Sequence, residues 1–139
     1  MSSLLEQARA RAAARRERQI TVSLPELGID LVCDVPTDMA VVERMQNEAK
    51  KFDKGRAQAT HFARALVAAQ TREIHIDGQV AEVDGEPAAF NDPETWRMLN
   101  VADAKSAVVE LIGADGDILS IASELMNEAG FGTDGDDPI

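Results

Sequence analysis

Residues 107–132 read AVVELIGADGDILSIASELMNEAGFG, and this stretch decides the fold. Apolar residues recur at helical spacing up to Gly113, which ends the first run, and again after Asp117. We expect Asp117 to cap the second helix and Gly130 to end it in a left-handed conformation. Two helices with one apolar side each must bury that side against the rest of the domain or against a partner. On the second helix the apolar side consists of Ile118, Ile121, Ala122, Leu125 and Ala129.

The sequence ITVSLPELGIDLVCDV, residues 20–35, predicts two short strands. Apolar residues alternate with other residues in 20–24 and again in 29–35, and Pro25 and Gly28 bracket the bend between them. The residues in between are mostly polar, so that one face of the pair is apolar. This pattern is typical of a small sheet that helices cover on one side.

Two Asp-Gly pairs, at 77–78 and 84–85, lie between β-type residues in the segment 73–90. The two central residues of a tight two-residue hairpin turn both need a positive φ, and Asp-Gly is favoured there because it adopts this geometry readily. We expect a small hairpin or a three-strand meander, in which either pair can supply the tight turn.

Four further segments predict helices. Residues 2–18 combine alanine, arginine, leucine and glutamine without glycine or proline, which favours either a solvated helical arm or an arm that orders on a partner. Residues 36–38, Pro-Thr-Asp, open an amphipathic helix, and a second helix covers about 57–71. In 92–94, Asp-Pro-Glu, the aspartate can cap a short helix and the proline suits its first position.

Together these elements predict an α+β fold, a mainly helical single domain in which a small antiparallel sheet (strand pair plus hairpin) packs on about five helices. We divide the chain into a basic helical arm (1–19), an acidic α+β domain (20–132) and a disordered acidic tail (133–139). The predicted core residues are apolar and lie at the matching positions of these elements: Val22, Leu24, Leu31, Cys33, Val42, Met45, Phe52, Phe62, Leu66, Ile76, Trp96, Leu99, Val108, Leu111, Ile121 and Leu125.

Composition argues against several classes of function. The chain has 139 residues and a formal net charge of −11, although its first 20 residues are basic. A domain this acidic repels phosphate backbones, so we expect no nucleic-acid partner. There is neither an apolar run of the ~20 residues that a membrane span needs nor the apolar centre of a signal peptide, so we expect a cytoplasmic protein. Because only 4% of residues are aromatic, we expect modest stability or stability gained by self-association.

No pattern in the chain predicts catalysis, and we expect no enzyme, no cofactor and no metal site. His61 and His75 lie in different elements, and neither has a second ligand at metal-site spacing. Cys33, the only cysteine, lies in an apolar run and is interpreted as a small buried hydrophobe. The segment 115–126 begins like a calcium loop but lacks the third acidic ligand, the glycine and the closing glutamate.

The order of elements resembles the tail assembly chaperones of siphophages, especially those of actinobacterial phages. The similar segments are LLEQARARAAARRERQ (4–19), the strand pair at 20–35, the charged amphipathic helix after it, and WRMLNVADAKSAVVELIGADGDILSIASELMNEAGFG (96–132). The segment 73–90 is the part least characteristic of that family.

The resemblance implies a protein that binds the tape measure protein in the host cytoplasm, keeps it soluble, recruits the major tail (tube) protein and is absent from the mature virion. It also implies that a longer form can arise by programmed ribosomal frameshifting. Methionine-bearing helical faces offer adaptable grooves to a long helical partner, and a tryptophan can anchor an interface. The candidate partner-binding residues are Met39, Val42, Met45, Trp96, Leu125 and Met126.

Two other functions agree with the sequence. A structural virion protein, such as a tail or head–tail joining subunit, would be present in purified particles and should carry longer strands. An acidic protein-binding inhibitor module would bind a basic enzyme surface with an affinity that falls steeply with salt.

Overall fold

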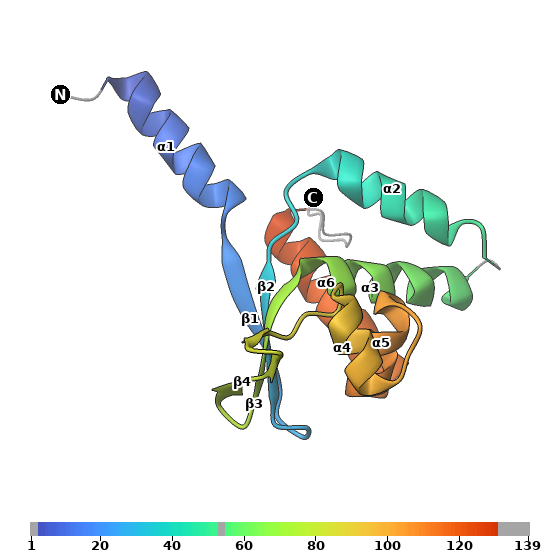
Figure 1. Ribbon diagram of the computed structural model, residues 1–139. Helices are drawn as coiled ribbons and strands as arrows, with labels where there is room; N and C mark the ends of the chain where they lie inside the picture. Colours follow the sequence, from blue (N-terminus) through green and yellow to red (C-terminus); the bar gives the residue numbers. More distant parts are fainter. Residues whose placement is uncertain (1–2, 53–54, 131–139) are drawn as a thin grey trace.

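The computed structural model describes residues 3–52 and 55–130, and of Arg56 only the backbone. These residues form an α+β fold, as predicted, with six helices and six short strands. Helices α2–α6 gather on one side of the sheet, while the N-terminal helix α1 extends away from the body (Figure 1). The predicted disordered tail, 133–139, lies outside the described residues.

The main sheet is antiparallel, with the strand order β1-β2-β3-β4, and β5 and β6 form a separate pair. The bounds are β1 Gln19–Leu24, β2 Ile29–Asp34, β3 Thr71–Ile76, β4 Gln79–Val80, β5 Glu82–Val83 and β6 Glu86–Pro87. The predicted strand pair is confirmed, and its register sets apolar residues opposite one another: Ile20 with Cys33, Val22 with Leu31, and Leu24 with Ile29. Such cross-strand pairs stabilise one face of the sheet for packing.

Both Asp-Gly pairs form tight turns, which the sequence had left open. Asp77 and Gly78 have φ of 52° and 84° and join β3 to β4, while Asp84 and Gly85 have φ of 55° and 82° and join β5 to β6. Positive φ at both central positions is the geometry for which Asp-Gly is favoured in a hairpin.

The remaining helices are α2 Met39–Ala49, α3 Arg56–Gln70, α4 Pro93–Leu99, α5 Ala104–Ile112 and α6 Asp115–Ala129. The predicted starts at Asp38 and Asp92 are confirmed, since each carboxylate accepts a backbone N–H two residues on, at 2.9 and 3.0 Å. The predicted cap at Asp117 is wrong. Helix α6 already begins at Asp115, so Asp117 lies in its first turn, where a carboxylate still favours the positive helix end.

The core lies between the inner face of the sheet and helices α3, α5 and α6. Helix α3 is central, because it packs against α2, α5 and α6. Most predicted core residues are buried or pack against buried ones, but Phe52 and Ile76 are 49% and 39% exposed, so these two predictions are wrong. Phe52 follows the last turn of α2, and Ile76 ends β3 beside the Asp77–Gly78 turn. Phe90, which the sequence did not single out, is fully buried.

Helix α1, Leu4–Arg16, contributes no buried residue to this core. It begins with a capping box in which Ser3 and Glu6 each accept the other's backbone N–H, at 3.0 and 2.9 Å. Its side chains at Leu4 and Leu5 are each 82% exposed. The predicted helix is therefore present as an arm held by local interactions.

Candidate interaction surface

The six candidate partner-binding residues divide into surface and core residues. Met39 is 46% exposed at the start of α2, and Met45 and Met126 are half-buried at the edge of the core. Val42 and Leu125 are 1% and 0% exposed, because the α2 and α6 faces that carry them pack onto the domain. These two side chains stabilise the fold and offer no surface to a partner in this structure.

Trp96 anchors helix α4 to the hairpin region. Its indole Nε1 donates a hydrogen bond to the backbone oxygen of Phe90 at 2.5 Å, and its ring packs half-buried against the core. A tryptophan commonly combines an apolar ring with one satisfied polar atom in this way. The structure thus gives Trp96 a positioning role within the domain.

A shallow apolar groove, here called the helical groove, runs between α2, α3 and α6. Its volume is about 240 Å³. It continues through Gln46, Ala59 and Phe62 into a second hollow of about 320 Å³ between α2 and α3. The lining of the first part is mostly apolar: Gln46, Ala59, Phe62, Ala63, Leu119, Ala122, Ser123, Met126 and Asn127. Of the six candidates, Met126 is the residue that lines this groove.

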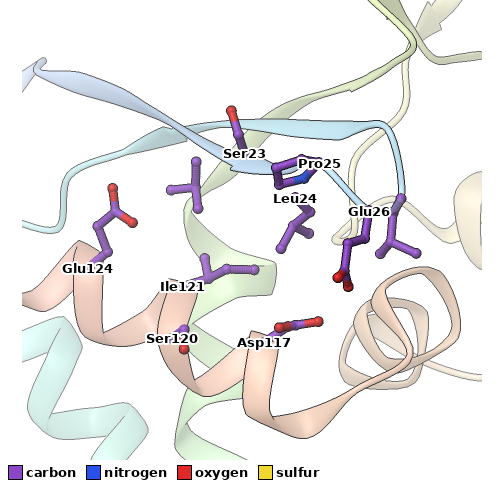
Figure 2. Close-up of a pocket in the computed structure, with 10 residues that line it drawn as sticks. Ser23, Leu24, Pro25, Glu26, Asp117, Ser120, Ile121 and Glu124 are labelled. Atoms are coloured by element: carbon purple, nitrogen blue, oxygen red, sulfur yellow. The ribbon is translucent and has the colours of Figure 1, made fainter.

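A larger hollow of about 460 Å³, here called the strand groove, lies between the β1–β2 hairpin and α6 (Figure 2). Its floor is apolar and is formed by Val22, Leu24 and Ile121. Figure 2 shows the carboxylates of Glu26 and Asp117 near one end and that of Glu124 near the other. Among the described residues, no lysine, arginine or histidine lines it, so the strand groove combines an apolar floor with an acidic rim.

The sequence did not reveal the strand groove, because its rim comes from distant segments. Glu26 belongs to the hairpin turn, whereas Asp117 and Glu124 lie seven residues apart on α6. Their spacing of two helical turns was readable, but only the packing of α6 beside β1 brings Glu26 to the same hollow.

Cys33 is fully buried, which confirms its interpretation as a small buried hydrophobe. Burial raises the pKa of the thiol, and the nearby Thr71 hydroxyl, whose oxygen lies 3.6 Å from Sγ, opposes this in part. A thiol held in its neutral form is a poor nucleophile.

Each of the two histidines contacts a neighbouring side chain. His61 stacks on the ring of Phe52, with ring centroids 3.9 Å apart, and partial burial lowers the pKa of its imidazole. His75 Nε2 lies 2.9 Å from the Glu73 carboxylate two residues earlier on β3. In residues 3–52 and 55–130, no three side chains of histidine, cysteine, aspartate or glutamate gather in a way that could hold a metal ion.

A polar hollow of about 410 Å³ near His61 also contains Asp103, Lys105 and Ser106. Asp103 caps α5 by accepting the Ser106 backbone N–H at 2.8 Å, and this hydrogen bond lowers the pKa of the carboxyl. A carboxylate committed to a helix cap is held in its ionised form, so Asp103 is a structural group.

Comparison with protein-family models, with curated proteins and with solved structures finds no match to this chain. Within the part of the chain that the structure describes, no helix has the length and apolar character to cross a bilayer.

Proposed function

We propose that the protein is a non-enzymatic tail assembly chaperone that binds the helical tape measure protein, keeps it soluble and recruits the major tail (tube) protein. The observation that carries the proposal is the helical groove, whose apolar lining between α2, α3 and α6 fits one face of an amphipathic helix. The resemblance of segments 4–35 and 96–132 to siphophage tail assembly chaperones supports the same function.

The chemistry of the groove suits a partner that is long and repetitive in its apolar face. The Met126 side chain is flexible, the Phe62 ring is flat, and both lie among alanines. The groove can therefore accept different apolar residues without requiring specific polar contacts. An exposed apolar stripe on a long helix would otherwise aggregate. The net charge of −11 would keep the complex of the two proteins in solution.

The proposal is tested by co-expressing the tagged protein with the tape measure protein of the same phage and measuring the soluble, co-purifying fraction. Met126→Glu should weaken capture at least about tenfold, because an unpaired carboxylate in an apolar contact costs more than ~1.4 kcal/mol. Met98→Glu is the matched control, since Met98 lies on α4, is 69% exposed and does not line the groove. Equal capture by both variants would contradict the assignment of the groove.

Mass spectrometry of purified particles separates the proposed function from its alternatives. A chaperone of this kind acts in the host cytoplasm and is absent from the mature virion, so its peptides should be missing from particles while they co-purify with the tape measure protein from infected cells. Stoichiometric presence in particles would instead identify a structural tail or head–tail joining protein. Exclusive capture of a compact basic enzyme would identify an acidic inhibitor.

A further inference from the structure

Within residues 3–52 and 55–130, the arm α1 lies outside the hydrophobic core. None of its residues is buried, and its two leucines are 82% exposed. An isolated helix of 13 residues is marginal in water even with a good cap, because most helical stability in proteins comes from packing of an apolar stripe. Docking on another surface would therefore stabilise the arm.

The arm carries an apolar stripe with arginines on both sides. Leu4, Ala8 and Ala12 follow one another at intervals of four residues and so lie on one helical face, next to Leu5. At 100° per residue, Arg11 lies along one side of this stripe and Arg9 and Arg16 lie along the other, while Arg15 lies within it, in line with Leu4 and Ala8. The helix contains these four arginines and one glutamate, Glu6.

The strand groove has the complementary pattern, with an apolar floor and three carboxylates on its rim. Asp117 and Glu124 are separated by seven residues on α6, and Arg9 and Arg16 are separated by seven residues on the arm. Seven residues of helix span about 10.5 Å. A helix lying along α6 can therefore set two arginines against two carboxylates while its leucines and alanines contact Leu24 and Leu27, the leucines of the lining that are not buried.

The arm points away from the strand groove of its own chain (Figure 1). It precedes β1 and extends from the end of the hairpin opposite the β1–β2 turn, as Figure 1 shows. The strand groove lies at the turn end, where Leu24–Leu27 form part of its lining. Glu17 and Arg18 connect α1 to β1, and Arg18 is held in place, since its backbone oxygen accepts the Val35 N–H at 2.9 Å and its guanidinium pairs with Glu128.

We propose that the arm α1 of one copy docks in the strand groove of a second copy, so that the protein self-associates head to tail. The contact is heterologous, because arm and groove are different surfaces, and it generates a ring or an open chain of copies according to its rotation. The inference does not depend on the proposed function, since purified protein alone tests it.

Sedimentation of the purified full chain over a range of protein and salt concentrations provides the test. The weight-average mass should rise with concentration and fall with added salt, because exposed ion pairs are screened. The charge reversal Arg9→Glu/Arg16→Glu, at the two arginines whose spacing matches Asp117 and Glu124, should weaken association at least about tenfold. The matched control, Arg44→Glu/Lys50→Glu, makes the same change in net charge at exposed positions of α2 and should leave association largely unchanged.

The groove is tested by Glu26→Lys/Glu124→Lys, which spares Asp117 in the first turn of α6. Glu43→Lys/Glu86→Lys is the control with the same charge change at exposed positions away from the groove. The variant with reversed charges on the arm (the arm variant) and the variant with reversed charges on the groove (the groove variant) should each be monomeric alone. Their equimolar mixture should form a 1:1 complex and nothing larger, because the intact arm of the groove variant still meets the intact groove of the arm variant.

Several outcomes would overturn the inference. Wild-type protein that stays monomeric at its highest soluble concentration would exclude a second copy as the occupant, as would association that survives both charge reversals. A mixture that fails to form the 1:1 complex while both variants keep the wild-type far-UV spectrum would exclude this pairing of arm and groove. Capture of the tape measure protein is a separate measurement, so the proposed function can stand or fall independently.

Discussion

The first and last helices differ in what holds them together. Helix α1, with 13 residues, has a complete capping box and buries no side chain. Helix α6, with 15 residues, has no side-chain cap but buries Ile118, Ile121, Ala122 and Leu125. The comparison separates two sources of helical structure. Helix α1 is held by local hydrogen bonds and propensity, which leave a helix of its length marginal in isolation, whereas α6 is held by packing, which supplies most helical stability in folded proteins.

The largest difference in the free energy of unfolding should appear between a variant with a new carboxylate in α6 and a variant with a new carboxylate in α1. Leu125→Asp inserts a carboxylate into a fully buried apolar site and should cost about 4 kcal/mol or more of the free energy of unfolding. Leu5→Asp, on the exposed arm, should change it by less than about 0.5 kcal/mol. Urea unfolding followed by circular dichroism, in dilute protein, checks both values. Indistinguishable curves would mean that α6 does not close the core.

A smaller difference in the free energy of unfolding should appear between a variant that loses a helix cap in the body and a variant that loses the helix cap of the arm. Asp103→Ala removes the carboxylate that caps α5 and should cost about 1 kcal/mol at neutral pH, whereas Ser3→Ala should reduce arm helicity without changing global unfolding. The pKa of Asp103 is lower in the folded chain than in the unfolded chain. Its contribution is therefore present above the unfolded-state pKa and lost as pH falls through the folded-state pKa.

The pH dependence can be measured as the difference in unfolding free energy between wild type and Asp103→Ala. This difference should be largest near neutral pH and should shrink on acidification toward about pH 3. Since both proteins share every other carboxylate, their general acid response cancels in the difference. If the difference in unfolding free energy stayed constant as pH falls, the loss of stability in Asp103→Ala would not come from the loss of an ionised cap.

The ion pair between Arg18 and Glu128 joins the root of the arm to the last turn of α6. Both side chains are more than a third exposed, so solvent screens their attraction. Arg18→Ala should cost at most about 1 kcal/mol, and added salt should reduce that cost. Thermal melts of the variant at low and high salt provide the measurement, and a large salt-independent loss would show that Arg18 contributes by packing instead.

Deleting residues 1–16 should have the smallest effect on unfolding. The deletion should remove helical signal from the far-ultraviolet spectrum, yet the melting temperature of dilute protein should stay within about 2 °C, because no residue of α1 is buried. A clear drop in dilute protein would show that the arm packs on its own domain. At high concentration, by contrast, the deletion should remove any dependence of melting on protein concentration.

Local signals in the sequence predicted much of the fold. Alternation predicted the β1–β2 hairpin, and aspartates marked the starts of α2 and α4. The Asp-Gly pairs indicated a tight turn without deciding which pair forms it, and in the structure both do. The start of α6 was misplaced because Asp115 and Asp117 are both good residues for a first helical turn, and Gly116 between them resembled a break.

Features that depend on long-range packing could not be predicted. Phe90 follows the β5–β6 pair without any apolar periodicity, yet it is fully buried and its backbone oxygen accepts the Trp96 indole. Phe52 and Ile76 fit apolar patterns but lie at the ends of their elements, where fewer neighbours cover them. Both grooves are lined by segments far apart in sequence. Of the candidate site residues, spacing alone could not separate the buried Leu125 from its neighbour Met126, which lines the helical groove.

The position of α6 in the chain also sets when the domain can fold during synthesis. Its four buried residues complete a core whose other members come from strands and helices that precede it in the chain. Until residue 125 has left the ribosome, the apolar faces of α3 and β1 lack their cover, and a nascent chain in this state exposes aggregation-prone surface. The arm, in contrast, buries no residue, so its helix, although marginal in isolation, does not wait for the core and can begin to form as soon as it emerges. The growing chain therefore presents a cationic helix to the cell before its acidic body closes.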